Sequence, residues 1–317
     1  MIQSVHFKNF RSLRDVKLNL APLTVLVGPN SSGKTSVLEG LLPRHYAISD
    51  VWRQNTNLEV EATWVYSGEM PTIVATAKPP NPTALTNMRS QFTISHWTPP
   101  HKAQSLALDL KALRKENTLA AASQLGRAGE NLTNVFATLT RQQQAAVAQE
   151  LCRLVPMFSD VDLQPISNGV HQLRFQDRWN SDLWFAPDQV SDGTMLVLAF
   201  IVLQYQNPPT DILTIEEPER ALHPYLLEEL IGLLRKMTTG EIGRKPVQVV
   251  LATHSAELLE YVRPEEVRFL TRSPEDGSVQ VNEAPTDSTN WQQVYKEYRE
   301  SLGSIWLSGS MGGVPGR

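Results

Sequence analysis

The pattern of apolar and polar positions divides the chain into three parts. Residues 1–27 alternate with a period of two, which predicts two β-strands, and the short apolar run at 23–27, rich in β-branched residues, predicts a buried strand. Three further strand-like runs, at 58–66, 72–78 and 91–97, are separated by Gly, Pro and Asn. We therefore expect an antiparallel sheet beside the buried strand.

The middle of the chain changes to helical spacing. Leucines recur at nearly helical intervals from residue 106 to residue 119. A stretch rich in Ala, Gln and Leu then predicts a further helix from about 132 to 154. Short alternating strands are expected again over 161–187.

The last third alternates between buried helices and buried strands. The stretch 195–205 is apolar on all sides, which predicts a buried helix. Two apolar runs, 212–215 and 247–252, predict buried strands on either side of a helix at 222–237. We therefore expect one α/β core built from both ends of the chain, with a helical subdomain inserted between them. The predicted parts are 1–103, 104–160 and 161–317.

A glycine-rich stretch carries the first candidate chemistry. Residues 28–35 read Gly-Pro-Asn-Ser-Ser-Gly-Lys-Thr and fit G-x-x-x-x-G-K-[ST] between a buried strand and an expected helix. In such a loop the backbone N–H groups face phosphates, Lys34 reaches the β/γ oxygens and the Thr35 hydroxyl ligates Mg²⁺. Unless the match is a chance one, it predicts binding of a nucleoside triphosphate. The predicted contact residues are Gly28, Asn30, Ser31, Ser32, Gly33, Lys34, Thr35 and Ser36.

Two glutamates follow the expected strand at 212–215. This arrangement places one carboxylate on Mg²⁺ and the next beside the attacking water. Glu216 is the candidate metal ligand, and Glu217 is the candidate group that orients or deprotonates the water. The alternative interpretation is a solvated cluster of charges at the end of a strand.

A histidine follows the expected strand at 247–252. His254 lies in Thr-His-Ser, at the strand end where open α/β sheets bind ligands. It is therefore a candidate for contact with the γ-phosphate. A structural histidine that caps the next helix would have the same sequence signature.

The stretch Ser-Asp-Gly-Thr at 191–194 opens the expected buried helix. Ser191 and the backbone N–H of Gly193 are candidates for a second anion site at a helix start. An ordinary helix N-cap is the alternative interpretation.

Composition narrows the class of protein. The formal net charge of −4 gives no basic excess, so a general nucleic-acid binder is not indicated. The single cysteine, Cys152, excludes an intramolecular disulfide and suits a reducing cytosol. The longest purely apolar run, 195–203, is too short to span a bilayer. We expect a cytoplasmic protein without membrane association.

The order of these motifs resembles the ATP-binding-cassette ATPase heads. Within them it resembles the RecF/SMC-like branch, especially stand-alone ATPases akin to the OLD family of phage-defence proteins. The resemblance rests on Asn-Phe-Arg-Ser at 9–12, the glycine-rich loop, 191–194, Glu-Glu-Pro-Glu-Arg-Ala-Leu-His-Pro at 216–224 and 253–255. Glu216 stands where transporter ATPases have an aspartate.

The resemblance implies a fold and a mode of action. The fold would be a P-loop NTPase of ABC-ATPase type, with a mixed sheet, flanking antiparallel strands and an inserted helical subdomain. Two copies would enclose two ATP molecules, each between the phosphate loop of one copy and the 191–194 signature of the other. Hydrolysis would then open the homodimer. A nucleotide-contacting glutamine is also implied, and Gln91 is the candidate.

Two functions are compatible with these features. In the first, a slow, regulatory ATPase controls a separately encoded effector, such as a nuclease or toxin in a bacterial anti-phage system. In the second, a RecF-like ATPase of DNA repair or chromosome maintenance binds DNA directly. Acidic charge favours the first, as does the shortness of the sequence after His254, which leaves no room for an OLD-type nuclease domain. A non-hydrolysing scaffold is disfavoured by the presence of both Lys34 and Glu217.

The C-terminal segment offers a further choice. Ile305, Trp306 and Leu307 lie within a Gly- and Ser-rich stretch. The segment is expected either to fray, to pack as a last strand on its own domain, or to dock on a second subunit or an effector.

Overall fold

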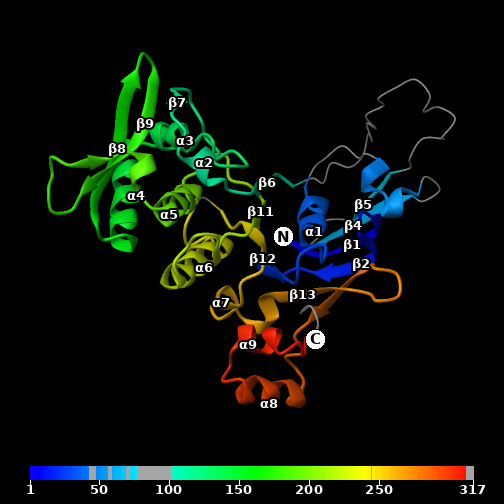
Figure 1. The fold of residues 1–317 in the computed structure, drawn as a ribbon. Coiled ribbons are helices and arrows are strands. Elements are labelled where there is room, and N and C mark those ends of the chain that lie inside the picture. Colours follow the sequence, from blue (N-terminus) through cyan, green and yellow to red (C-terminus); the bar gives the residue numbers. More distant parts are fainter. Residues whose placement is uncertain (43–47, 56–58, 69–71, 78–100, 244, 312–317) are drawn as a thin grey trace, which may run out of the picture. The chain divides into compact units, whose positions relative to one another are not determined.

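The computed structural model describes residues 1–42, 48–55, 59–68, 72–77, 101–243 and 245–311 (Figure 1). The chain forms two compact units, each assembled from segments that are distant in the sequence. The first unit contains 1–105, 210–217 and 248–317, and the second contains 106–209 and 218–247.

The central sheet of the first unit has the strand order β14-β13-β3-β12-β11-β6. Strands β13, β3, β12 and β11 are parallel to one another, and β14 is antiparallel to β13. Because parallel strands end at the same edge of a sheet, the segments that follow β3, β12 and β11 lie together. The strand bounds are β3 Leu23–Val27, β6 Ala103–Leu106, β11 Ile212–Glu216, β12 Gln248–Thr253, β13 Val267–Arg272 and β14 Val279–Glu283.

A second, antiparallel sheet has the order β2-β1-β4-β5. It confirms the two strands predicted within 1–27 and the strand-like runs at 58–66 and 72–78. Buried and more exposed residues alternate along β4, as a sheet with one covered face requires. The run predicted at 91–97, which includes Gln91, lies outside the described residues. The bounds are β1 Ile2–Phe10, β2 Leu13–Asn19, β4 Val60–Tyr66 and β5 Ile73–Ala77.

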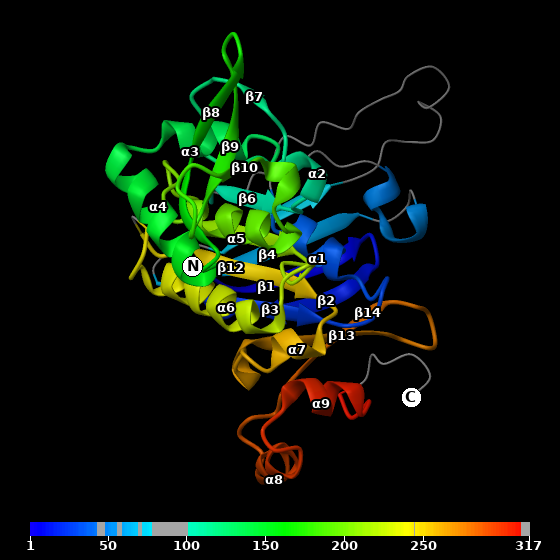
Figure 2. The ribbon, with the colours of Figure 1, turned by 60° about the vertical axis from the view of Figure 1, so that its left-hand side comes forward.

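Short helices connect these strands. Helix α1 follows the phosphate loop and contacts β1, β11 and β12. The bounds are α1 Lys34–Gly40, η1 Ile48–Asp50, η2 Trp52–Gln54, α7 Ala256–Leu259, η5 Pro264–Glu266, α8 Thr289–Glu297 and α9 Leu302–Leu307. Figure 2 shows α9 beside α7, and the two helices are in contact.

The C-terminal segment packs on its own unit as a helix rather than as the expected strand. Ile305 is fully buried and Trp306 is only 7% exposed, whereas Leu307 is 50% exposed. Glu260 Oε1 accepts hydrogen bonds from the Ser301 hydroxyl and the Gly303 N–H. Docking of Ile305 and Trp306 on another protein is therefore not what the structure shows, because this unit already buries them.

The second unit combines a helical cluster with a small sheet, which has the order β10-β9-β7 and β8 paired with β9. Helix α4 packs on both α5 and β8, so residues 158–167 and 192–203 belong with the predicted helical insertion. The bounds are α2 Leu110–Leu113, β7 Asn117–Thr118, α3 Leu132–Thr138, α4 Arg141–Leu154, β8 Phe158–Ser167, β9 Val170–Asp177, β10 Trp184–Phe185, η4 Pro187–Gln189, α5 Asp192–Leu203 and α6 Pro224–Thr239.

Two helix predictions have different outcomes here. The single helix predicted from 132 to 154 is wrong, because α3 ends at Thr138 and Thr140 starts α4. The Thr140 side chain accepts from the Gln143 N–H and the Gln143 side chain accepts from the Thr140 N–H, which forms a capping box. The buried helix predicted at 195–205 is confirmed: residues 193–203 of α5 are all buried. In the described part of the chain, no helix combines the length and apolarity that crossing a bilayer requires.

Candidate functional site

The phosphate loop connects the fully buried strand β3 to helix α1. Ser31 and Gly33 have left-handed backbone conformations, with φ of 62° and 104°, and Gly33 immediately precedes the helix. Gly28 is required for a different reason: a Cβ at this position would collide with the carbonyl oxygen of Leu270. The two fixed glycines of the motif therefore provide a tight turn and a close approach of backbone to backbone.

Lys34 lies inside this loop. Its side chain is among the buried polar groups, with 6% exposure. The ammonium donates to the carbonyl oxygens of Gly28 at 2.8 Å and Pro29 at 2.9 Å, and its Nζ is 3.4 Å from Nδ1 of His254. The positive charge is thus held at the centre of the loop, as a phosphate cradle requires.

Glu216 and Glu217 differ in backbone geometry. Glu216 is the last, partly buried residue of β11. Glu217 turns away with φ of 45°, and its N–H donates to the carbonyl oxygen of Ala252 on β12 at 2.9 Å. Its side chain is 51% exposed and faces the cavity described below. Glu217 is thus a lining residue of that cavity, whereas Glu216 is not.

His254 lies between Lys34 and Glu217. Its Nε2 is 3.6 Å from Glu217 Oε1. Burial lowers the pKa of His254, and the charge of Lys34 lowers it further, while Glu217 and the Gly28 backbone oppose the shift. A neutral imidazole with Nδ1 facing the ammonium and N–H at Nε2 fits both neighbours.

The alternative interpretation of His254 as a helix cap is wrong. The cap of α7 is Ser255, whose hydroxyl oxygen accepts from the N–H of Leu258 at 3.1 Å. His254 is therefore left to face Lys34 and Glu217.

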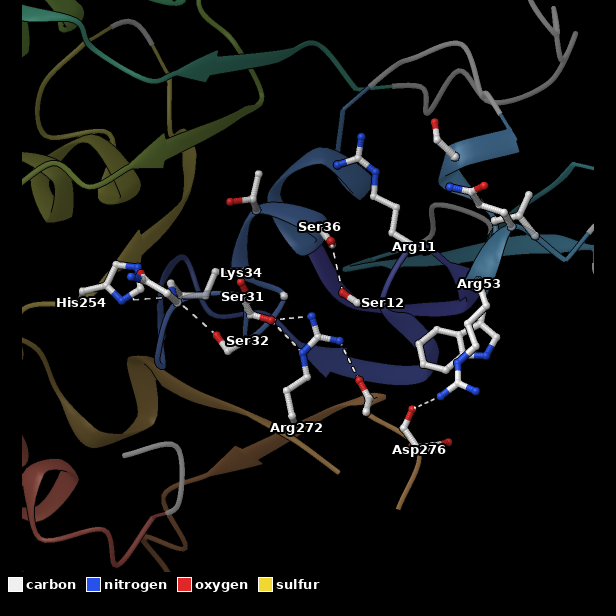
Figure 3. Close-up of a pocket in the computed structure, with 18 of the residues that line it drawn as sticks. Arg11, Ser12, Ser31, Ser32, Lys34, Ser36, Arg53, His254, Arg272 and Asp276 are labelled. Atoms are coloured by element: carbon white, nitrogen blue, oxygen red, sulfur yellow. Dashed lines mark hydrogen bonds between the residues drawn. The ribbon is translucent and has the colours of Figure 1, made fainter. Parts of the chain in front are cut away.

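These residues line one cavity of the first unit, with a volume of about 830 Å³ (Figure 3). It brings together most of the predicted phosphate-loop residues, Asn30 to Ser36, with Glu217 and His254. It also contains residues for which the sequence predicted no contact: Arg11, Ser12, Ser49, Val51, Trp52, Arg53, Gln54, Arg272, Asp276 and Gly277. Only Arg11 and Ser12 had a sequence signal, because they belong to the Asn-Phe-Arg-Ser stretch.

The predicted signature residues belong to the second unit. Ser191 is the N-cap of α5: its hydroxyl oxygen accepts from the N–H of Thr194 at 3.1 Å. A Cβ on Gly193 would come within 3.1 Å of the carbonyl oxygen of Ala221. Asp192 is paired with Arg114 at 2.7 Å. The N-cap interpretation is thus confirmed, and a role for Ser191 and Gly193 in nucleotide binding stays a prediction.

The residues of the cavity fit a Mg²⁺–nucleotide complex. The loop presents a buried cation, Lys34, and a helix N-terminus at the same place, which suits a polyphosphate. Thr35 is exposed at the start of α1 and lines the cavity, and Glu216, which is not among the lining residues, ends strand β11 of the same sheet. Hydroxyl and carboxylate oxygens are ligands that Mg²⁺ prefers.

Family models match both parts of the chain. A model described as "AAA domain, putative AbiEii toxin, Type IV TA system" matches residues 95–260, and one described as "AAA ATPase domain" matches residues 1–43. Among curated proteins, an OLD nuclease of Thermus scotoductus is 44% identical over 52 residues, 16% of this chain and 9% of that protein. An uncharacterized protein of Methanocaldococcus jannaschii is 45% identical over 42 residues, 13% of this chain and 19% of that protein. The matched segments are thus small parts of these relatives.

Solved structures of SMC heads share the fold. One is an SMC head bound to the C-terminal winged-helix domain of ScpA, with a TM-score of 0.57 and 13% identity over 90% of this chain and 99% of that one. Another, from Pyrococcus furiosus, is a head with an extended coiled coil bound to the C-terminal domain of ScpA. Its TM-score is 0.55 with 12% identity, over 94% and 99% of the two chains. The likeness confirms the predicted fold class and the resemblance to SMC-type ATPase heads.

Proposed function

Because the chain belongs to the AbiEii-like AAA-domain ATPase family, we propose that it is an ATP-driven switch that controls a separately encoded effector. The effector is a nuclease or toxin of a bacterial anti-phage defence system. The protein dimerises around ATP, and slow hydrolysis of the ATP ends its control of the effector. Family membership supports the ATPase activity, and the limited OLD match supports the link to defence.

The observation that carries the ATPase assignment is the convergence of Lys34, Glu217 and His254. Lys34 is the first residue of α1, Glu217 follows β11 and His254 follows β12, and α1 is distant in the sequence from the two strands. Their side chains nevertheless form the series Lys34–His254–Glu217, with separations of 3.4 and 3.6 Å. A cation for the phosphates is therefore next to a carboxylate that can accept a proton.

Each residue has a distinct task in this proposal. Lys34 and the N–H groups of the loop bind and orient the phosphates, and Glu217 accepts the proton of the attacking water. His254 keeps the carboxylate directed at the phosphate side of the cavity. Thr35 and Glu216 would hold Mg²⁺, which supplies positive charge against the phosphate oxygens when bound.

Dimerisation rests on the signature at the start of α5. The Ser191 hydroxyl and the backbone at Gly193 lie at the positive end of a buried helix of 12 residues. We expect this helix end to bind the γ-phosphate of the ATP held by the second copy. The two copies would then separate once that phosphate is released.

The test combines mass with effector control. The masses of wild-type protein and the Glu217→Gln variant are measured by light scattering with ATP and with ADP. Both proteins are also purified from the native host in the presence of each nucleotide. We expect dimers with ATP, and an effector whose activity differs between the ATP-locked Glu217→Gln protein and the Lys34→Ala protein. A mass independent of ATP would contradict the switch. DNA affinity of the purified protein that falls steeply with salt would instead support the RecF-like alternative.

A further inference from the structure

The cavity has a second wall beyond the phosphate loop. It is formed by η1 and η2, through Ser49 and the segment 51–54, and by the turn between β13 and β14. Figure 3 shows Arg53 and Asp276 well separated from Lys34 and His254, with Arg272 and Ser31 in between. A triphosphate at Lys34 therefore leaves this part of the cavity to the rest of the nucleotide.

The wall is attached to the antiparallel sheet β2-β1-β4-β5. The Arg11 guanidinium donates to Asp50 Oδ1 at 2.7 Å, and the Arg11 N–H donates to the Asp50 carbonyl oxygen at 2.7 Å. Asp50 itself is 2% exposed, and Val51 forms a β-bridge with Phe10. The entry to η2 is therefore fixed by buried contacts.

The wall is also connected to the phosphate loop through the β13–β14 turn. Arg53 donates to the Asp276 carbonyl oxygen, and Arg14 pairs with the Asp276 carboxylate at 2.6 Å. Arg272 donates from Nε to the Ser31 carbonyl oxygen at 2.7 Å and from Nη1 to that of Gly277 at 2.7 Å. The β13–β14 turn thus fixes the position of the second wall relative to the phosphate loop.

Two side chains of η2, Trp52 and Arg53, bring planar groups to the cavity. The Arg53 guanidinium lies 5.1 Å from the centroid of the Trp52 ring. Arg53 and Gln54 both have left-handed φ values, 50° and 54°, which are uncommon outside glycine and persist where surrounding contacts hold them. The guanidinium lies over the indole ring, and indoles and guanidinium planes are groups on which nucleobases stack.

We propose that Trp52 and Arg53 form the base-binding part of the nucleotide site and select a purine nucleoside triphosphate. The inference rests on the proposed function, because it requires the triphosphate to bind at Lys34. A purine offers two fused rings to the wall, and a pyrimidine offers one, so stacking favours the purine. The polar side chain of Gln54 lines the same wall, where it would be available to the polar ring edge of the base.

The test separates base from phosphate. ATP, CTP and inorganic triphosphate, each with Mg²⁺, are titrated into wild-type protein and the Trp52→Ala and Trp52→Phe variants. Trp179→Ala is the matched control, because Trp179 is 76% exposed and belongs to the second unit. We expect Trp52→Ala to weaken ATP binding about tenfold and to remove most of the preference for ATP over CTP. Inorganic triphosphate should bind this variant as it binds the wild type, and Trp52→Phe should retain ATP affinity.

Two results would overturn the inference. If Trp52→Ala leaves ATP affinity unchanged, the base binds elsewhere; if it weakens ATP and inorganic triphosphate equally, Trp52 supports the fold of the loop instead. A failure of the proposed function is distinguishable, since wild-type protein would then bind neither ATP nor inorganic triphosphate. The Lys34→Ala variant should bind both ligands much more weakly, as expected if they share one site.

Discussion

His254 Nε2 lies 3.6 Å from Glu217 Oε1, although the two residues follow different strands of the central sheet. The register of β11 against β12 pairs Glu216 with Ala252, which brings Glu217 and His254 to the same edge. This relationship places an imidazole of lowered pKa beside the carboxylate expected to accept a proton. Burial is the largest cause of that lowered pKa, so the pair depends on the packed edge of the sheet.

The Glu217→Gln variant should bind ATP but hydrolyse it about 100- to 10,000-fold more slowly, because an amide cannot accept the proton. We expect it to accumulate as an ATP-bound dimer in light scattering. Glu297→Gln, on the exposed side of α8, is the control and should be unchanged. Hydrolysis by Glu217→Gln at the wild-type rate would exclude the assigned role.

The Lys34→Ala variant should bind ATP about 100-fold more weakly, because a charged donor at the phosphates is lost. The same change removes a donor to the Gly28 and Pro29 carbonyl oxygens. Calorimetric titration measures the affinity, and the melting temperature shows whether the loop still folds. Unchanged affinity in a folded variant would mean that the nucleotide binds elsewhere.

Ser191→Asp tests the predicted anion site at the start of α5 and is preferred to a substitution of Gly193. An aspartate still caps α5 but brings a negative charge to the phosphate, whereas a side chain at residue 193 approaches the Ala221 carbonyl oxygen. We expect Ser191→Asp to be folded and inactive alone. Mixed with Lys34→Ala protein, it should regain part of the activity, because one composite site stays intact.

The control for that mixture is Ser191→Thr, which keeps both the cap and the hydroxyl and should remain active. Heterodimers of Ser191→Asp and Lys34→Ala proteins must be demonstrated with two different tags. If they form and the mixture stays inactive, the two motifs do not act across the dimer.

The stability of the protein should fall as the pH decreases below about 6.5, the pKa of an unperturbed histidine. Burial lowers the pKa of His101, whose Nε2 donates to the Leu41 carbonyl oxygen and whose Nδ1 is 2.7 Å from the Tyr66 hydroxyl. Because the folded pKa is the lower one, the unfolded chain takes up the proton first. The neutral histidine therefore contributes stability above pH 6.5 that is lost as the pH falls through both pKa values.

Denaturant unfolding at pH 7.5 and pH 5.5 measures this effect. His101→Gln should show a smaller loss of unfolding free energy between the two pH values than the wild type. His254 has a lowered pKa as well and contributes in the same direction, so the comparison is made between single variants. An identical loss in His101→Gln would exclude His101 as a source of the pH dependence.

Trp306→Ala should destabilise the protein by about 3–5 kcal/mol, because it removes a large buried side chain from α9. Leu307→Ala is the matched control, and its half-exposed side chain should cost far less. Denaturant unfolding measures both variants. Equal, small effects would mean that α9 packs weakly and would return the docking hypothesis to consideration.

The sequence determined the local chemistry of this protein. The phosphate loop, the two glutamates at the end of β11 and the histidine after β12 were found because each lies at the end of a short, largely apolar strand. Such strands are recognisable from a few residues, since a buried parallel strand must be apolar on both faces. The helix of 12 residues after Ser191 was recognisable for the same reason.

Only the tertiary structure decided which distant segments form the cavity. Trp52, Arg53, Arg272 and Asp276 show no periodicity or motif, and they line it because Arg53 and Arg272 donate to backbone carbonyl oxygens of other segments. A hydrogen bond to a backbone carbonyl leaves no trace in the partner's sequence, because every residue carries that group. The break between α3 and α4 was missed for a related reason: the capping box at Thr140 is local, but the apolar helical pattern continues through it.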